Sequence, residues 1–255
     1  MPTPLMPPTP GPGHVRQPLA CLLAAYALTL VSPTRAAATW SIVAVDPKTQ
    51  EVGSAGASCT RFVAGIVGLA PGHGVIVAQA ASNAEAREKG VAMLMAGSSP
   101  AQVVAAVATA AFDADFEEQQ YGVAALGFDE TVAAFTGART HPAQRHVLGR
   151  GVAVQGNILT NADVIDRALA AFDAPELRTR PLADRLLAAL EAGGAAGGDR
   201  RCDQQTALSA YLAVAKPTDN PRTPYIRVIV PGQKPGSPNP VRLVRKKYDA
   251  WRQTH

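Results

Sequence analysis

The chain has 255 residues, of which 47% are hydrophobic and 17% charged, with a formal net charge of +4 at pH 7. This composition is too apolar and too weakly charged for a disordered chain, and the length suits one large domain or two small ones. The weak positive charge, without a long basic run beside aromatic residues, argues against nucleic-acid binding, and three cysteines without a CxxC pair exclude a disulfide-rich scaffold and a zinc knuckle.

The first 38 residues have the layout of a secretory signal peptide. An uncharged apolar stretch over 19–31 follows basic residues and is too short to span a bilayer comfortably. Ala36 and Ala38 fit the small-residue rule for a cleavage site. We therefore predict that residues 1–38 are a cleaved signal peptide and that the protein is periplasmic or secreted. The alternatives are a buried helix and an uncleaved anchor.

The remaining residues, 39–255, are predicted to form a single domain that opens with a β-hairpin. Apolar and β-branched residues predict a strand over 39–45, residues 46–50 predict a turn, and small residues predict a second strand over 51–58. The other predicted elements are, in chain order, a strand over 75–80, helices over 85–95 and from Pro100 to about 112, a hairpin over 121–127 and 131–135, a strand over 152–155, a helix ending near 172, a helix over 181–190, strands over 206–214 and 225–230, and a basic helix over 240–251.

Strand pairs and helix pairs follow one another in blocks, without the strict alternation of a doubly wound parallel sheet. This order favours a layered α+β protein with antiparallel sheets and helices outside. Pro-rich stretches over 216–224 and 231–240 are interpreted as connectors within the domain. For the two cysteines of the mature chain, Cys59 and Cys202, we predict separate thiols, although an oxidising compartment would permit a bridge.

Several catalytic signatures do not occur in the sequence. It contains no GK[ST] phosphate loop, no HExxH, no GxSxG elbow and no SxxK. His141 and His146 lie five residues apart, but no acidic residue is placed to complete a metal set. We therefore predict neither a metal site nor a cofactor. A histidine-based serine triad has no local signature either.

Cleavage after Ala38 would leave Thr39 as the first residue. An N-terminal α-amine has a pKa of about 7.7–8.0, so it can take the proton of the threonine hydroxyl and later return it to a leaving amine. One residue would then supply both nucleophile and base. The alternative is that Thr39 is simply the residue that signal peptidase leaves first. Its position favours catalysis, because a predicted strand begins there and would hold the amine in place.

The segment TWSIVAVDPKTQEVGSAGAS, residues 39–58, resembles the opening of a bacterial family known as domain of unknown function 1028. Its members begin Thr-Phe-Ser-Ile-Val-Ala, continue with an Asp-Pro-x-Thr-Gly turn and end a small-residue strand in Ala-Ser. The likeness covers essentially residues 39–251 and continues through Gln79-Ala80-x-Ser82-Asn83, Ala134-Phe135-Thr136-Gly137, His146, Gln155-Gly156-Asn157-Ile158-Leu159 and Gly197-Gly198-Asp199-Arg200-Arg201. The chain departs from the pattern at Ala84, where proline is usual, at Cys202, where glycine is usual, and at Gln205-Thr206, where Ser-Ala is usual.

That family is similar to the N-terminal nucleophile (Ntn) hydrolases. The resemblance implies an α+β fold, a four-layer αββα sandwich with two antiparallel sheets flanked by helices. In the family the threonine usually follows the initiator methionine, whereas here the signal peptide would unmask it.

The candidate site residues each have a structural alternative. Thr39 is the predicted nucleophile and base, and Ser58, near the place where this fold puts groups that tune the amine, is otherwise a strand-end hydroxyl. Asn83 and Asn157 are candidate oxyanion donors, or else turn and helix-cap residues. The predicted substrate-binding residues are Gln79, His146, Asp199 and Arg200. Asp199 with Arg200 or Arg201 would bind a charged substrate end or form a structural ion pair, and His146 is otherwise structural.

Three functions remain open at this point. The first is an exported amidohydrolase that cleaves a small linear amide or peptide-like substrate through an acyl-enzyme on Thr39. The second is a non-catalytic periplasmic protein that binds a small ligand on the same fold. The third is a scaffold whose basic helix over 240–251 docks to a partner. The expected partner is a small-molecule amide, with no nucleic acid, no membrane span after cleavage, and a homodimer as a possible assembly.

Overall fold

The computed structural model describes residues 1–4, 6, 39–129 and 131–255. The chain divides into Met1–Pro33 and Thr34–His255, and every described strand and helix belongs to the second unit. The predicted signal peptide lies almost wholly outside the described residues. Within the described ranges, no helix has both the length and the apolar character that a membrane crossing requires.

The second unit contains ten strands, five α-helices and four short 3₁₀ turns in its described part. The strands are β1 (Thr39–Asp46), β2 (Glu51–Ser58), β3 (Val67–Ala70), β4 (Gly74–Ala80), β5 (Gln119–Ala125), β6 (Val132–Thr136), β7 (Arg145–Gly149), β8 (Val152–Asn157), β9 (Ser209–Ala215) and β10 (Ile226–Val230). The helices are α1 (Ala84–Met95), α2 (Pro100–Val107), α3 (Asp163–Phe172), α4 (Leu182–Ala195) and α5 (Pro240–Arg252). The 3₁₀ turns are η1 (Val63–Ile66), η2 (Phe116–Glu118), η3 (Pro175–Leu177) and η4 (Arg200–Gln205).

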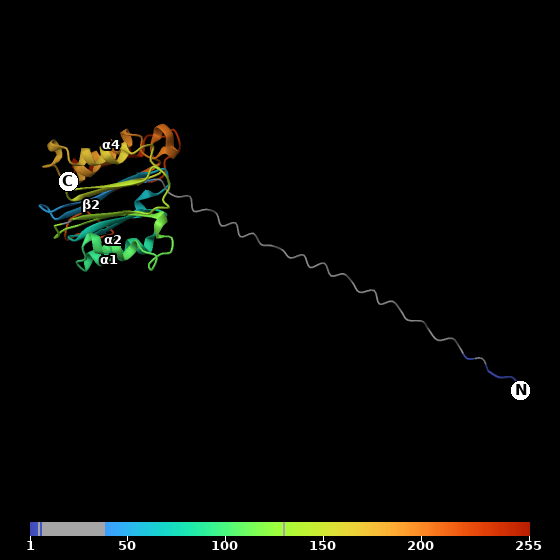
Figure 1. Ribbon diagram of the computed structural model, residues 1–255. Coiled ribbons are helices and arrows are strands. Elements are labelled where there is room, and N and C mark those ends of the chain that lie inside the picture. Colours follow the sequence, from blue (N-terminus) through green and yellow to red (C-terminus); the bar gives the residue numbers. More distant parts are fainter. Residues whose placement is uncertain (5, 7–38, 130) are drawn as a thin grey trace. The chain divides into compact units, whose positions relative to one another are not determined.

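The strands form two antiparallel sheets. The six-stranded sheet has the order β10-β9-β2-β1-β8-β7, and the four-stranded sheet has the order β3-β4-β5-β6. Contacts of β1 with β4 and β5 place the sheets face to face. Helices α3, α4 and α5 pack on the six-stranded sheet, and α1 and α2 pack on the four-stranded sheet (Figure 1). The predicted α+β class with two antiparallel sheets and helices is confirmed.

Strand β1 has two different faces because successive side chains in a strand point to opposite sides. Trp40 and Ile42 belong to the apolar core under the helices, whereas Val43 belongs to the core between the sheets. Trp40 Nε1 donates a hydrogen bond to the carbonyl oxygen of Leu190 in α4 at 3.2 Å. A Cβ at Gly193 would lie 2.7 Å from Trp40 Nε1, so only glycine leaves room there for the indole. Helix α4 thus fixes the start of β1.

Local sequence patterns misplace several boundaries. Strands β3 and β7 were not predicted, since the first has four residues and the second is a half-exposed edge strand without regular alternation. Helix α2 ends at Val107 rather than near 112, because Thr109 starts a separate turn by accepting hydrogen bonds at its own carbonyl and hydroxyl oxygens. Strand β9 begins at Ser209 rather than 206, and Thr206 has a left-handed backbone with φ of 60°.

The prediction of two separate thiols is wrong. Cys59 and Cys202 form a disulfide, with their Cα atoms 5.8 Å apart and a sequence separation of 143. Cys59 follows directly after β2, and Cys202 lies in η4, which leads into β9. Because β2 and β9 pair along their whole length, this pairing brings the two cysteines to the same end of the sheet.

Candidate active site at the start of strand β1

Three side chains form one row at the start of β1. Thr39 lies directly opposite Ser58 of β2 and directly opposite Asn157 of β8. Directly opposed residues of antiparallel strands share a face of the sheet, and this face is turned toward the other sheet. All three residues are buried, with exposed fractions of 1%, 0% and 1% in that order. The fold therefore brings together three of the four residues predicted to be catalytic.

Asn157 contacts the backbone nitrogen of Thr39. The Thr39 N–H donates a hydrogen bond to Asn157 Oδ1 at 3.1 Å. Asn157 Nδ2 is buried and has no hydrogen-bond partner among the described residues. A buried polar group without a partner costs about 1–3 kcal/mol, so each such group calls for an explanation. This donor is therefore a candidate for contact with a ligand. Ser58 Oγ accepts a hydrogen bond from the Thr60 N–H at 3.1 Å.

Two residues further along β1 from Thr39, the side chains that face the space between the sheets are polar on both sheets. On the six-stranded sheet this row consists of Ser41, Gln155 and His146. On the facing four-stranded sheet it consists of Gln79, Gln120 and Thr136. These six residues are named the polar row below.

Hydrogen bonds join the polar row across the two sheets. Gln155 Nε2 donates to Ser41 Oγ at 2.7 Å, and Ser41 Oγ donates to Gln79 Oε1 at 2.5 Å. Gln79 Nε2 donates to Gln120 Oε1 at 2.7 Å and, more weakly, to the carbonyl oxygen of Thr39 at 3.4 Å. Gln79 was predicted to bind substrate, and in the folded chain it contacts the backbone of Thr39. Its geometry indicates a role in positioning that residue.

The polar row ends at His146. Gln120 Nε2 donates to Thr136 Oγ1 at 2.8 Å and to the carbonyl oxygens of Arg145 and Gly156 at 3.2 and 3.0 Å. Thr136 Oγ1 lies 2.8 Å from His146 Nδ1. Burial lowers the pKa of His146 below its ordinary value of 6.5, which favours the neutral imidazole. A continuous set of hydrogen bonds thus connects Thr39 with His146.

Asp199 ties the loop before β9 to the end of β2. It is fully buried and accepts hydrogen bonds from the Cys59 N–H at 2.6 Å and from the Arg201 N–H at 3.0 Å. Its carboxylate also forms an ion pair with the Arg201 guanidinium, at 2.9 Å. Of the two ion pairs that the sequence left open, the one with Arg201 forms. Asp199 and the Cys59–Cys202 disulfide together hold this loop beside Ser58.

Asn83 caps a helix. Its side chain accepts a hydrogen bond from the Ala86 N–H at 2.9 Å, at the start of α1, and its Nδ2 donates to Asp113 at 2.7 Å. Hydrogen bonds from the backbone of Asp115 and from the Gln119 side chain lower the pKa of Asp113. The hydrogen bond from Asn83 lowers this pKa further. Both polar atoms of Asn83 are therefore engaged. The geometry favours the helix-cap alternative over an oxyanion donor.

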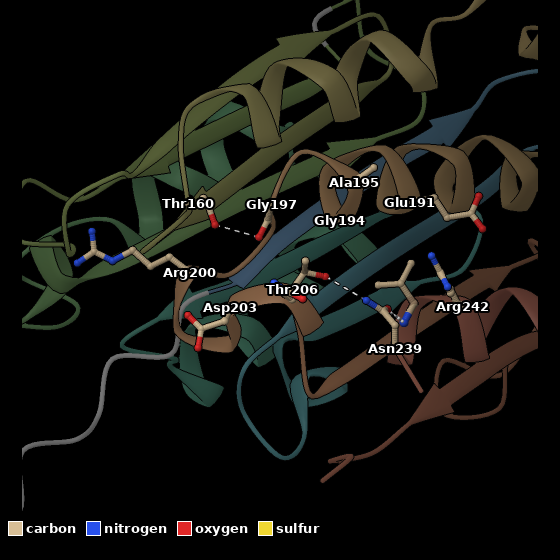
Figure 2. Close-up of a pocket in the computed structure, with 12 residues that line it drawn as sticks. Thr160, Glu191, Gly194, Ala195, Gly197, Arg200, Asp203, Thr206, Asn239 and Arg242 are labelled. Atoms are coloured by element: carbon tan, nitrogen blue, oxygen red, sulfur yellow. Dashed lines mark hydrogen bonds between the residues drawn. The ribbon is translucent and has the colours of Figure 1, made fainter. Parts of the chain in front are cut away.

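Arg200 lines a pocket of about 680 Å³ on the helix side of the six-stranded sheet. Neither Thr39 nor Asp199 is among the residues that line this pocket. Figure 2 shows Arg200 and Asp203 toward one end of the pocket and Arg242 toward the other. In the described part of the chain, no hydrogen bond or ion pair engages the side chains of these three residues. Arg200 is thus exposed at a pocket near the site but does not belong to the row of Thr39.

The described residues contain no group of three or more His, Cys, Asp or Glu side chains placed to hold a metal ion. Ser41, Gln120 and Gln155 were not predicted as site residues. A usable signal was the alternation on the strands, since Gln155 and Asn157 share a face two residues apart in an otherwise apolar strand. Which polar residues face each other across two sheets depends on tertiary packing.

The fold and the row around Thr39 define an α+β protein with two facing antiparallel sheets and a buried polar region at one end. The model of a family described as a family of unknown function, DUF1028, matches residues 39–236. The chain belongs to that family, as predicted. A crystal structure of protein SPO2555 from Silicibacter pomeroyi, assigned to the same family, is 28% identical, with a TM-score of 0.70, over 84% of this chain and 85% of that one. No curated protein matches the chain significantly.

Proposed function

We propose that the protein is exported, cut before Thr39, and hydrolyses a small linear amide through an acyl-enzyme on the Thr39 hydroxyl. The observation that carries the proposal is the contact between the Thr39 nitrogen and Asn157 Oδ1 at 3.1 Å, beside a buried Asn157 Nδ2 without a partner in the described residues. The order of helices, sheet, sheet and helices supports assignment to the four-layer sandwich of the Ntn hydrolases. The substrate would be uncharged at the scissile bond and small or peptide-like.

In the proposed reaction the Thr39 α-amine takes the hydroxyl proton, directly or through one water molecule, as Oγ1 attacks the amide carbonyl carbon. The α-amine returns that proton to the leaving nitrogen as the C–N bond breaks, which leaves an ester on Oγ1. Water then hydrolyses this ester, with the same amine as base. The amine suits this work because its ordinary pKa is about 7.7–8.0.

Asn157 would serve the reaction at both of its polar atoms. Oδ1 would accept a hydrogen bond from the α-amine and so direct the nitrogen lone pair. Nδ2 would donate to the oxyanion of the tetrahedral intermediate, an interaction worth about 2.7–4 kcal/mol when it is preorganised. Burial of this donor before substrate binds is the preorganisation that such a role needs. Gln79 would hold the Thr39 backbone from the other sheet.

The test begins with the intact mass and N-terminal sequence of the exported protein, which should start at Thr39. A panel of small linear amides is then assayed for release of the amine product. Thr39→Ala should abolish turnover while the protein stays folded, and Asn157→Ala should lower kcat by about 10²–10³. The control Thr49→Ala lies in the exposed β1–β2 turn and should retain full activity.

A start elsewhere than Thr39, or turnover that persists in Thr39→Ala, would overturn the proposal. The non-catalytic alternative predicts ligand-induced stabilisation that survives both in Thr39→Ala and in a chain with residues retained before Thr39. The enzyme proposal predicts that such an extended chain is inactive, because its Thr39 nitrogen is an amide and cannot act as a base.

A further inference from the structure

A pocket of about 940 Å³ lies beyond the other end of β1 from Thr39. Its walls come from the β1–β2 turn, the segment before α4, the connector after β9 and the end of α5. Seven steps of about 3.3 Å along β1 separate this end from Thr39 by about 23 Å. Figure 1 shows the β1–β2 turn and the C-terminus at the same end of the second unit. The pocket is therefore remote from the proposed active site.

Three cationic side chains from three separate segments line this pocket. They are Lys48 in the β1–β2 turn, Arg178 before α4 and Lys216 after β9, and all three are exposed. None has a carboxylate partner within the described ranges. The Arg178 Nε–H donates only to a backbone carbonyl oxygen, that of Asp173, at 3.2 Å. Lys216 Nζ lies 4.4 Å from the centre of the Tyr225 ring.

Two further cations in the wall share one buried carboxylate. Arg180 and Arg252 approach Asp184 at 3.3 and 3.1 Å, and the Asp184 side chain is 6% exposed. Asp184 also accepts a hydrogen bond from the Tyr248 hydroxyl at 2.8 Å. Its single negative charge is thus shared between two guanidinium groups at the edge of the pocket.

Two acidic side chains, Asp46 and Glu51, also line the pocket, and both make local hydrogen bonds. Asp46 accepts from the Lys48 N–H at 2.9 Å within the turn, and Glu51 accepts from the Tyr225 hydroxyl at 2.7 Å. Five cationic groups thus converge on a concave surface with two lining carboxylates and Asp184 beneath. Like charges that converge in a cleft raise the local potential and attract anions.

We propose that this pocket binds a small organic phosphate. A phosphate monoester carries about −1.5 to −2 charges at pH 7 and three acceptor oxygens, which suits the three cations without a carboxylate partner better than a single carboxylate does. Arginine matches phosphate by paired N–H donors. The organic part of the ligand lies against the apolar surface of Tyr225 and Trp251. The volume falls within the range of about 300–1,000 Å³ that is typical of small-molecule sites.

The test is calorimetric titration of the protein with phenyl phosphate at low ionic strength, with inorganic phosphate and benzoate as comparison ligands. Phenyl phosphate should bind saturably, with one site per chain and more tightly than either comparison ligand. The double variant Lys48→Ala/Arg178→Ala should bind phenyl phosphate at least about tenfold less tightly than the parent protein. Lys246→Ala, which removes an exposed cation of α5 outside the pocket, should bind like the parent protein.

Equal affinity for phenyl phosphate and inorganic phosphate would show an adventitious ion only and would overturn the proposal. Equal affinity for benzoate would overturn the phosphate assignment. The proposal also fails if phenyl phosphate does not bind, or if the double variant, shown by circular dichroism to be folded, binds as tightly as the parent. Thr39→Ala should bind phenyl phosphate normally, so the outcome is independent of the proposed amide hydrolysis.

Discussion

The space between the two sheets has two ends of opposite character, although the same strands build both. At one end Val43, Val45, Val75, Val77 and Ala124 pack together as an apolar core. At the other end, two residues further along the same strands, the polar row and the row of Thr39 fill the space with amides and hydroxyls. The change from Val43 to Ser41 on β1 is matched by the change from Val77 to Gln79 on β4.

This difference separates stability from function. Apolar burial stabilises the fold by about 25 cal/mol per Å², whereas a buried amide adds little even when it is fully hydrogen-bonded. Valine in place of Gln79 and Gln155 would extend the apolar core toward Thr39. The polar end instead retains Asn157 Nδ2 as a buried donor without a partner in the described residues. Packing alone does not account for this cost, and the arrangement surrounds the residue that we propose as the nucleophile.

The largest expected effect concerns the disulfide that holds the polar end. Cys59→Ser/Cys202→Ser should lower the free energy of unfolding by about 4 kcal/mol, because the bridge closes a loop with a sequence separation of 143 residues. Urea unfolding followed by circular dichroism measures the change. Reductant should destabilise the parent protein to the level of the variant and leave the variant unchanged. A loss below about 1 kcal/mol would mean that Asp199 and the strand pairing alone fix this end.

A smaller effect is expected inside the polar row. Gln79→Leu should cost about 1–3 kcal/mol, because it removes the donor to the amide oxygen of Gln120 and the acceptor for the hydroxyl hydrogen of Ser41. Gln120→Leu should cost a similar amount. The loss of unfolding free energy in the double variant should be smaller than the sum of the two single losses by about 1 kcal/mol. The reason is that each single variant leaves the amide of the other residue without its hydrogen-bond partner.

Val77→Ala is the matched control at the apolar end of the same strand. It should cost about 2 kcal/mol, through lost burial alone, and leave the amide turnover proposed for Thr39 unchanged. Gln79→Leu should lower that turnover, because Gln79 contacts the carbonyl oxygen of Thr39. Strict additivity of the Gln79 and Gln120 losses in urea midpoints would contradict the hydrogen-bonded network.

Elements set by local patterns were predictable from the sequence. The β1–β2 hairpin follows from the β-branched residues of its first strand, the turn over 46–50 and the small residues of its second strand, and the start of α2 follows from Ser99 and Pro100. Ser99 and Gln102 form a reciprocal capping box, which is a purely local contact. The α+β class also follows from the order of the elements, because blocks of strands and helices restrict the layers that can form.

The site was predictable only in its parts. Thr39 and Asn157 are 118 residues apart in sequence, and their contact depends on the register of β1 with β8, which no local pattern encodes. The disulfide depends in the same way on the pairing of β2 with β9. Asn83 illustrates the opposite case: its position just before α1 was enough to suggest a helix cap, and that local role is the one observed.

The smallest expected effect concerns His146, where the polar row approaches solvent. Burial lowers the pKa of His146 below 6.5, so the unfolded chain binds a proton at this residue more readily than the folded protein does. The contribution of neutral His146 to stability is therefore present above pH 6.5 and is lost as the pH falls through the lowered pKa. His146→Gln does not titrate and can still hydrogen-bond to Thr136 Oγ1.

Thermal unfolding between pH 7.5 and pH 5 should therefore show a steeper decrease in Tm for the parent protein than for His146→Gln. The scan stops at pH 5 so that Asp113, whose pKa is lowered from 3.8, stays ionised in both proteins. Every other titrating group is shared by the two proteins, so the difference between the curves isolates His146. Parallel curves would mean that solvent reaches His146 freely. The buried part of the polar row would then end at Gln120.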